Sequence, residues 1–454
     1  MRLSHRGTSR LLIALSALLL VPAVLWAHTK LLSSSPANGA TISTAPSLIR
    51  LVFSERAALA MASVRLVSGA DTTNLTPLAL DPQNPNEIIA PVNAELETGS
   101  YTVLWRVAGR DGHPIRGTVS FTVAGTFTPV DPTSPPPAAP MAHDDQVEGV
   151  GIALGGAIGF ILVRWLAFIS IFFLIGAVTF KHYVVARAAP LESDVFGRIA
   201  STNAASFGMA AAVGLALTAI LKLGRESLDM PDMPVTALLF GSTWGTSLFA
   251  QLLLTLIAVA AFRAAHSDSD SVRNTGWKVA LGASLAAAIT PAFGGHAIAG
   301  ENTLVAVAAD IVHILAGSAW LGTLGVIVIV GIPAALKSPD EIRPGARVAS
   351  LINTFSPLAL LCGGSVVATG LGSSVIRLPS VDSLWTTPYG VALLLKLIFV
   401  ALLFAAGMWN WRRMKPRLTG DNAIGPLRSS ASLELVLAGA VLGLTAILVA
   451  LALP

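Results

Sequence analysis

Three residues in the first quarter of the sequence have side chains able to bind a transition metal. His28 follows an apolar leader, and Asp111 and His113 stand two positions apart in "RDGHP". If the leader is removed after Ala27, His28 offers both its α-amine and a ring nitrogen. His113 adds a third nitrogen and Asp111 an oxygen, a set that favours Cu(II) in tetragonal geometry. The residue types therefore predict a Cu(II) site, provided that His28 lies near the other two.

The same residues have a simpler interpretation as a turn and a chain end. Asp-Gly is a common turn pair, and Pro114 stiffens the exit from the turn. His28 is then an ordinary N-terminal residue. Spacing alone leaves both interpretations open.

The leader itself has the features of a secretory signal peptide. Residues 1–27 have a basic start, an apolar core and an alanine at the predicted cleavage point. An uncleaved anchor helix is the alternative, and it would leave His28 without a free α-amine. The only cysteine is Cys362, so the chain forms no internal disulfide and contains no CxxC motif.

Apolar residues are distributed unevenly along the 454-residue chain. A hydrophobic content of 54% with 12% charged residues exceeds that of soluble proteins and predicts a membrane protein. Residues 28–125 nevertheless read as an exported soluble domain, and residues 149–454 hold long apolar runs. A proline-rich tether, residues 126–148, joins these two domains.

Residues 28–125 alternate between apolar and other residues at period two in several short stretches, such as 49–53, 101–107 and 119–123. Turn-forming segments separate these stretches. The pattern predicts an all-β sandwich of about seven antiparallel strands, with a Greek-key fold of the immunoglobulin or cupredoxin-like kind.

The remainder predicts a polytopic α-helical membrane domain. We expect about eight transmembrane helices, at 155–180, 203–222, 236–262, 279–298, 303–335, 350–374, 387–411 and 431–453. Lysines and arginines concentrate in alternate connections, whereas the other connections carry only Lys222, Arg225 and Arg377. Because cytoplasmic loops retain positive charge, this asymmetry puts the N-terminal domain on the periplasmic or extracellular side. No GxxxxGK[ST] phosphate loop occurs, which argues against an ATP-driven pump.

Ionisable and sulfur-bearing residues within the membrane domain could line a copper path. Ionisable groups in hydrocarbon are costly and often mark such pathways, and thioethers are soft ligands suited to Cu(I). The candidates are His296, Asp310, His313, Met209, Met230 and Met233. Structural hydrogen bonds and ordinary methionine packing are the alternatives. His182 and His266 fall in cytoplasmic connections, where we expect them to be solvated.

Several motifs resemble known copper-protein families. "SSPANGAT", "LVFSE" and "YTVLWRVAGRDGHPIRGTVSFTV" resemble the CopC family of exported copper-binding proteins, and "GGHAIAG", "DIVHILAGSAWLG" and "TPYGVALLLKL" resemble the CopD family. The first resemblance implies a Cu(II) site of His28, Asp111 and His113, with Glu55 as a candidate outer ligand. CopC proteins that also bind Cu(I) carry a methionine-rich stretch, whereas this domain has only Met61. No Cu(I) site is therefore expected in the sandwich.

Together these features predict a non-enzymatic copper-binding and copper-transport protein of the cytoplasmic membrane. The exported domain would capture Cu(II), and the bundle would import copper, in part as Cu(I). The expected partners are copper ions, the membrane, and extracytoplasmic copper donors or reductases, with no nucleic acid. One alternative is a resistance or sensing protein that binds copper without transporting it. Another is a copper- or haem-dependent membrane redox enzyme.

Overall fold

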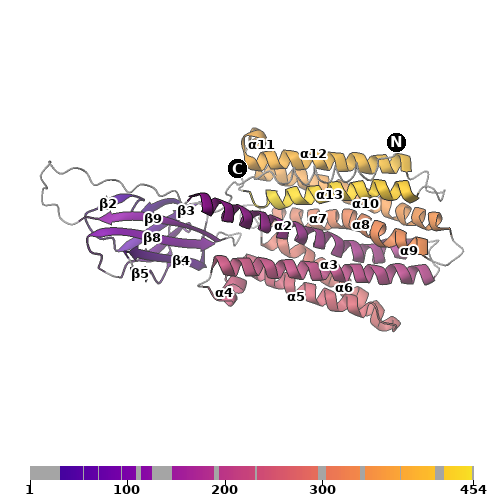
Figure 1. Ribbon diagram of the computed structural model, residues 1–454, viewed down its shortest axis with the longest axis horizontal. Helices are drawn as coiled ribbons and strands as arrows, with labels where there is room; N and C mark the ends of the chain where they lie inside the picture. Colours follow the sequence, from indigo (N-terminus) through magenta and orange to yellow (C-terminus); the bar gives the residue numbers. More distant parts are fainter. Residues whose placement is uncertain are drawn as a thin grey trace.

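A computed structural model shows a β-sandwich joined to a long helical bundle (Figure 1). It describes residues 31–54, 56–69, 71–93, 95–108, 114–124, 146–188, 194–230, 233–294, 303–337, 343–378, 380–414 and 424–451. The sandwich lies beyond one end of the bundle, and the two contact each other through β4 and α4.

The sandwich has two sheets, with strand orders β1-β3-β7-β6 and β2-β9-β8-β4-β5. The strands are β1 (Leu31–Ser35), β2 (Ala40–Ile42), β3 (Leu48–Phe53), β4 (Ala58–Ser68), β5 (Asp71–Asn74), β6 (Ala79–Leu80), β7 (Glu87–Pro91), β8 (Gly99–Ala108) and β9 (Pro114–Val123). The predicted all-β sandwich is confirmed, with nine strands among the described residues instead of about seven. One pair, β2 and β9, is parallel, whereas the prediction was wholly antiparallel.

Period-two alternation produces the sandwich core. Ile49, Leu51 and Phe53 of β3 are fully buried and face the core from one sheet. Trp105 of β8 faces them from the other, and its ring lies 5.3 Å from that of Phe53 in an edge-on arrangement. Gly117 is required opposite Trp105, because a Cβ at this position would lie 2.3 Å from the indole ring. The strand pattern and one glycine thus set the core packing.

The bundle begins with α2, which enters from the sandwich side (Figure 1). Its elements are α2 (Gln146–Thr179), η1 (Phe180–Val185), α3 (Asp194–Asp229), α4 (Val235–Phe240), α5 (Thr243–Ala264), α6 (Asp270–Ile289), η3 (Thr290–Phe293), α7 (Thr303–Gly317), η5 (Ser318–Gly322), α8 (Thr323–Val326), η6 (Ile327–Gly331), α9 (Ile332–Lys337), α10 (Pro344–Arg377), α11 (Ser383–Thr386), α12 (Pro388–Trp409), η7 (Asn410–Met414) and α13 (Ile424–Leu448).

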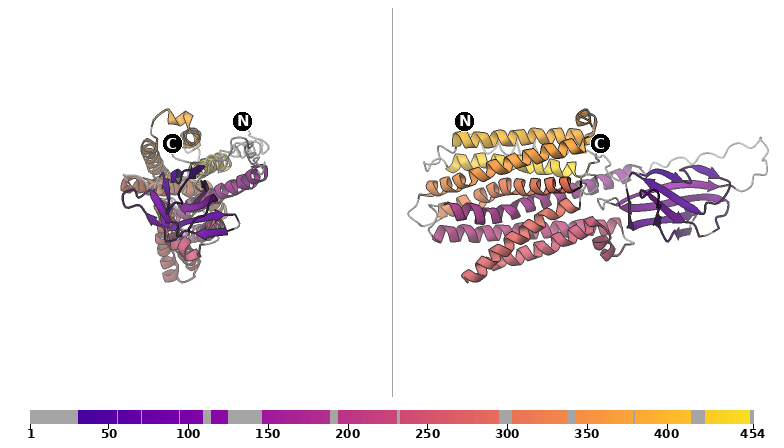
Figure 2. Two further views of the ribbon diagram at one scale, coloured as in Figure 1. Left: turned by 90° about the vertical axis from the view of Figure 1, so that its left-hand side faces the viewer. Right: turned by 180° about the vertical axis from the view of Figure 1, so that it is seen from behind.

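Within the described residues, seven helices are long and apolar enough to cross a membrane, compared with about eight predicted. The prediction for 279–298 corresponds to α6 and η3, which begin and end earlier in the chain. Asp270, Arg273 and Lys278 make the first half of α6 polar. Figure 2 nevertheless shows α6 running beside α5 within the bundle. The eighth predicted span is therefore a bundle helix with weaker apolar character.

The span from α7 to α9 is the most deeply buried of the seven. It alternates between α-helical and wider π-helical turns, the latter at η5 and η6. Gly322 in η5 packs directly on α2, since a Cβ at Gly322 would lie 1.8 Å from the carbonyl oxygen of Phe172. Small residues permit such close backbone approach between membrane helices. This glycine contact holds the helix that carries Asp310 and His313 against α2.

Candidate functional site

The predicted Cu(II) ligands of the sandwich lie outside the described residues, as does His296 of the predicted membrane path. Those sandwich residues are His28, Glu55, Asp111 and His113. The strand register nevertheless shows at which end of the sandwich the described residues on either side of these ligands lie.

Four predicted ligands are flanked by strand ends that meet at one end of the sandwich. Leu31, at the start of β1, pairs with Phe53, at the end of β3. Ala58, at the start of β4, pairs with Ala108, at the end of β8. Ala108 also pairs with Pro114, at the start of β9. Three segments therefore start or finish at the same end of the domain: the one with His28, the one with Glu55, and the one with both Asp111 and His113.

This end of the sandwich faces the helices. Met61, near the start of β4, is fully buried. Its Cγ would lie 3.5 Å from a Cβ at Gly241, which immediately follows α4. Figure 1 shows α4 beside β4 at the junction of the two domains. We call this the bundle-facing end of the sandwich.

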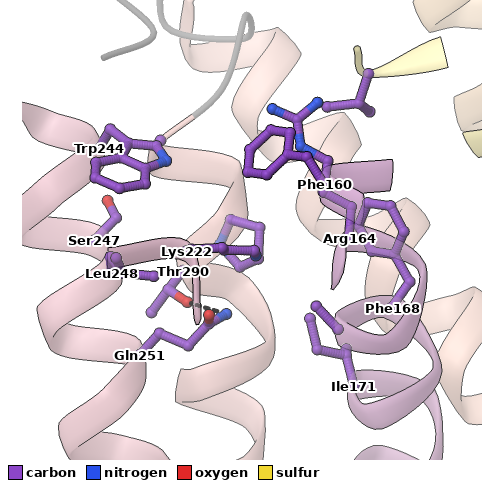
Figure 3. Close-up of a pocket in the computed structure, with 14 residues that line it drawn as sticks. Phe160, Arg164, Phe168, Ile171, Lys222, Trp244, Ser247, Leu248, Gln251 and Thr290 are labelled. Atoms are coloured by element: carbon purple, nitrogen blue, oxygen red, sulfur yellow. Dashed lines mark hydrogen bonds between the residues drawn. The ribbon is translucent and has the colours of Figure 1, made fainter. Parts of the chain in front are cut away.

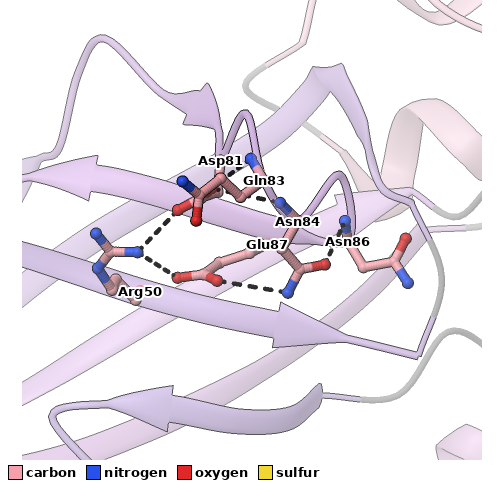
Figure 4. Close-up of polar contacts among 6 residues, drawn as sticks. All are labelled: Arg50, Asp81, Gln83, Asn84, Asn86 and Glu87. Carbon is pink, nitrogen blue, oxygen red and sulfur yellow. Dashed lines mark hydrogen bonds and ion pairs between the residues drawn. The ribbon is translucent and has the colours of Figure 1, made fainter.

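An ionic cluster braces the same end (Figure 4). Arg50 of β3 donates to Asp81 at 3.0 Å and to Glu87 at 2.7 Å, tying β3 to the turn between β6 and β7. In that turn, the carbonyl oxygen of Asn86 accepts a 2.9 Å hydrogen bond from the backbone N–H of Phe53. The contacts hold the end of β3, from which the chain continues to Glu55.

In the bundle, His313 of α7 is half-buried and held by α10. Its Nδ1 lies 2.9 Å from the Oγ1 of Thr369. The same hydroxyl lies 2.7 Å from the carbonyl oxygen of Ser365, so Thr369 links the imidazole ring to the backbone of α10. Metal-ligating histidines are commonly oriented by a hydrogen bond at one ring nitrogen.

Asp310 lies on the same helix, three positions before His313, and is also half-buried. Side chains three apart on a helix are neighbours. Among the described residues, however, no group of three or more histidine, cysteine and acidic side chains could hold a metal ion. Within the part of the chain that the structure describes, Asp310 and His313 therefore form at most a two-residue coordination set.

The three predicted path methionines are separated. Met209, in the middle of α3, packs against the core of the bundle. Met230 lies 21 positions further along, about 30 Å at helical rise. Met230 and Met233 instead pack with Met61 of the sandwich. Sequence reasoning assigned Met61 no ligand role, because no pattern links residues so far apart in the chain.

A cavity of about 120 Å³ lies between α2, α3, α5 and η3 (Figure 3). Arg164 and Lys222 line it together with Gln251, whose amide donates to the Oγ1 of Thr290 at 3.0 Å. The Arg164 guanidinium also lies 4.2 Å from the ring centre of Phe160. Two basic side chains in its lining disfavour the binding of a copper ion in this cavity.

Two histidines expected to be solvated are tied to neighbouring helices instead. His182 is half-buried, and its Nε2 lies 3.3 Å from the carbonyl oxygen of Trp277 on α6. His266 contacts the carbonyl oxygen of Phe262 at 2.7 Å and the hydroxyl of Ser206 at 2.8 Å. The prediction was wrong because both residues lie at helix ends that pack within the bundle.

Comparisons with known proteins match successive parts of the chain. Residues 31–124 match the CopC domain, residues 155–306 the copper resistance protein D-like N-terminal domain, and residues 349–448 copper resistance protein D. The copper transport protein CutJ of Bacillus subtilis (strain 168) is 24% identical over 421 residues, covering 90% of this chain and 72% of CutJ.

Shorter relatives match the sandwich alone. Copper resistance protein C of Pseudomonas syringae pv. tomato is 35% identical over 111 residues, which cover 23% of this chain and 87% of that protein. The crystal structure of CopC from Methylosinus trichosporium OB3b aligns with 26% identity and a TM-score of 0.21, covering 23% of this chain and all of that one. With a CopC domain followed by CopD-related domains in one polypeptide, the chain belongs to the copper resistance and transport family as a CopC–CopD fusion.

Proposed function

We propose that the sandwich captures Cu(II) outside the cytoplasmic membrane and that the bundle carries copper inward. The observation that carries this proposal is the strand register. It brings the segments flanking His28, Glu55, Asp111 and His113 to the bundle-facing end of the sandwich. A donor held beside its acceptor has a high effective concentration there.

The geometry of His313 supports copper passage through the bundle. Thr369 of α10 orients its ring through a 2.9 Å contact at Nδ1, and Asp310 lies three positions earlier on the same helix. A partial coordination set suits a transported ion, because an ion must leave each site as well as bind it. We propose that His313 is one contact along this route, with Asp310 beside it.

The distribution of basic residues supports the proposed orientation of the protein in the membrane. Helix α4 follows the end of α3 and contacts the sandwich, so α3 ends on the sandwich side of the bundle. The end of α2 and the start of α3 therefore lie at the opposite, far end of the bundle. Lys181 and Arg187 occupy that far end. Positive residues remain in the cytoplasm during insertion, which supports an extracytoplasmic sandwich. An inside-negative membrane potential then favours inward movement of a cation.

The test is the copper content of copper-limited cells that express the wild type, His28→Ala or His313→Ala. We expect the wild type to raise cellular copper and both variants to reduce that gain. His266→Gln is a suitable control, since His266 lies in helix-to-helix contacts away from the predicted path. Equal copper in cells with and without the protein would contradict import. Lower copper in expressing cells under copper excess would favour a resistance role.

A further inference from the structure

Three methionines from two domains pack together at the junction between the sandwich and the bundle. Met61 comes from β4, whereas Met230 and Met233 come from the connection between α3 and α4. Met61 and Met230 have no exposed surface, and Met233 is half-buried against them. Leu238 and Leu223 complete the apolar surroundings. We call these three residues the junction methionines.

Backbone contacts fix the positions of the junction methionines. The N–H of Met230 donates to the carbonyl oxygen of Glu226 at 2.9 Å, which continues the last turn of α3. The N–H of Met233 donates to the carbonyl oxygen of Met230 at 3.1 Å, closing a tight turn. On the sandwich side, Met61 lies on β4, whose residues 63–67 pair with β8, and its Cγ would be in ordinary contact, at 3.5 Å, with a Cβ at Gly241. The three methionines therefore lie on backbone segments that have hydrogen bonds of their own.

Ordinary packing is the simpler explanation, since methionine fills irregular gaps in cores. Its distribution in this chain argues for more. The protein has eight methionines, and three of them meet in this one small contact between domains. The buried core of the bundle, as far as the structure describes it, consists mainly of alanine, leucine and valine and contains no methionine. Neutral sulfur donors without nitrogen or carboxylate partners select Cu(I) among the biological copper ions.

The location also fits a metal in transit. Met61 lies three residues after Ala58, about 10 Å along the strand from the bundle-facing end. That end is flanked by the segments that contain the predicted Cu(II) ligands. On the bundle side, Met230 directly follows α3, a helix long enough to span the membrane. The junction methionines thus lie between the place of proposed capture and the helices.

We propose that Met61, Met230 and Met233 form a Cu(I)-binding site shared by the two domains. Such a site would involve the sandwich in Cu(I) binding, contrary to the expectation from sequence, because Met61 would supply one of the three sulfur atoms. Its role as a transfer point rests on the proposed transport function and requires an extracytoplasmic one-electron donor that reduces the captured Cu(II) to Cu(I). Its capacity to bind Cu(I) depends on neither.

The experiment uses the purified full-length chain and Ag(I), a redox-inert monovalent ion with the same preference for sulfur. Each junction methionine is changed to leucine, singly and together, because this swap nearly conserves volume and so retains the domain contact. Met408→Leu is the control, an exposed methionine of α12 outside the cluster and outside the predicted copper path. We expect the triple variant to lose one equivalent of bound Ag(I), each single variant to bind it more weakly, and Met408→Leu to match the wild type.

X-ray absorption of the chain loaded with Cu(I) provides a second readout. We expect sulfur scatterers around Cu(I) in the wild type and their loss in the triple variant. Met233 is the least buried of the three, so Met233→Leu is the substitution least able to disturb the fold. If this variant and the triple variant both bind Ag(I) like the wild type, the methionines serve only to pack the two domains together and the proposal is wrong. Loss of Ag(I) binding with unchanged cellular copper import would uphold the site and reject its transfer role. Failure of His28→Ala to alter import, with Ag(I) binding intact, would count against the proposed function and not against this site.

Discussion

The sandwich and the bundle present potential copper ligands in different ways. In the sandwich, the predicted nitrogen and oxygen ligands belong to segments whose flanking strands meet at one end of a braced β-framework. In the described part of the bundle, the histidine, cysteine and acidic side chains form no group of three that could hold a metal ion, and His313 lies three positions after Asp310 on α7. The difference suggests a division of work, with tight capture in the first domain and weak, successive contacts in the second.

The largest effect should come from separating the bundle helices while leaving the sandwich intact. Gly322→Ala places a Cβ 1.8 Å from the carbonyl oxygen of Phe172, a clash between two backbones. We expect loss of folded protein in the membrane or loss of copper import, measured by detergent-solubilised yield and cellular copper. Gly364→Ala is the control, because no atom lies within 4 Å of a Cβ at that position. Normal import by Gly322→Ala would show that close packing of α2 on η5 is dispensable.

The next largest effect should be on Cu(II) binding by the sandwich. His113→Ala removes one of the proposed nitrogen ligands. Loss of a hydrogen bond that only supports a metal ligand can cost roughly 100-fold in metal affinity. We therefore expect loss of the ligand itself to lower the affinity for Cu(II) by at least that factor. Titration of the full chain with Cu(II), followed by electron paramagnetic resonance, measures the change. His313→Ala should leave this titration unchanged. Identical Cu(II) spectra for His113→Ala and the wild type would remove the basis for capture by the sandwich.

A smaller effect is expected where α10 orients the bundle histidine. Thr369→Val keeps the side-chain shape but removes the hydroxyl that lies 2.9 Å from His313 Nδ1. Supporting hydrogen bonds to metal ligands are worth roughly 10- to 100-fold in affinity or activity. We expect import to fall within that range and Cu(II) binding by the sandwich to stay constant. Thr369→Ser restores the hydroxyl and should restore import, and an inactive serine variant would argue that the threonine acts through packing.

The smallest effect concerns the ionic cluster that braces the sandwich. The backbone N–H of Gln83, followed by the Arg50 guanidinium, lowers the pKa of Asp81 below its usual range. A lowered folded-state pKa contributes stability above the unfolded pKa, and this stability is lost as pH falls through the folded pKa. Asp81→Asn should therefore speed hydrogen exchange in residues 79–91 of the full chain at neutral pH. The difference from wild type should vanish in acid, and a difference that persists there would exclude the carboxylate charge as its cause.

Periodic patterns in the sequence predicted much of the fold. Alternation in 49–53 and 101–107 indicated half-buried strands, and long apolar runs indicated membrane helices. The parallel pairing of β2 with β9 was not predictable, because three residues of β2 carry no signal of direction. The start of α6 at Asp270, within polar sequence, and the π-helical turns of η5 and η6 likewise depend on tertiary packing, which periodicity does not encode.

The candidate sites show the same limit. His313 was predictable as an ionisable residue in an apolar run, but its partner Thr369 lies 56 positions away on another helix. Met61 was visible as a single methionine of the sandwich, and only the folded junction brings it to Met230 and Met233. Residue type indicates which side chains can bind copper, whereas their grouping depends on contacts between distant segments.

Initial rates of radioactive copper uptake by cells, measured across external copper concentrations, test most directly whether capture and passage occur in series. Capture by the sandwich predicts that His113→Ala raises the copper concentration needed for half-maximal uptake with little change in the maximal rate. Passage through the bundle predicts that His313→Ala lowers the maximal rate. Uptake by the wild type no faster than by cells lacking the protein, or kinetics unchanged in both variants, would contradict the account.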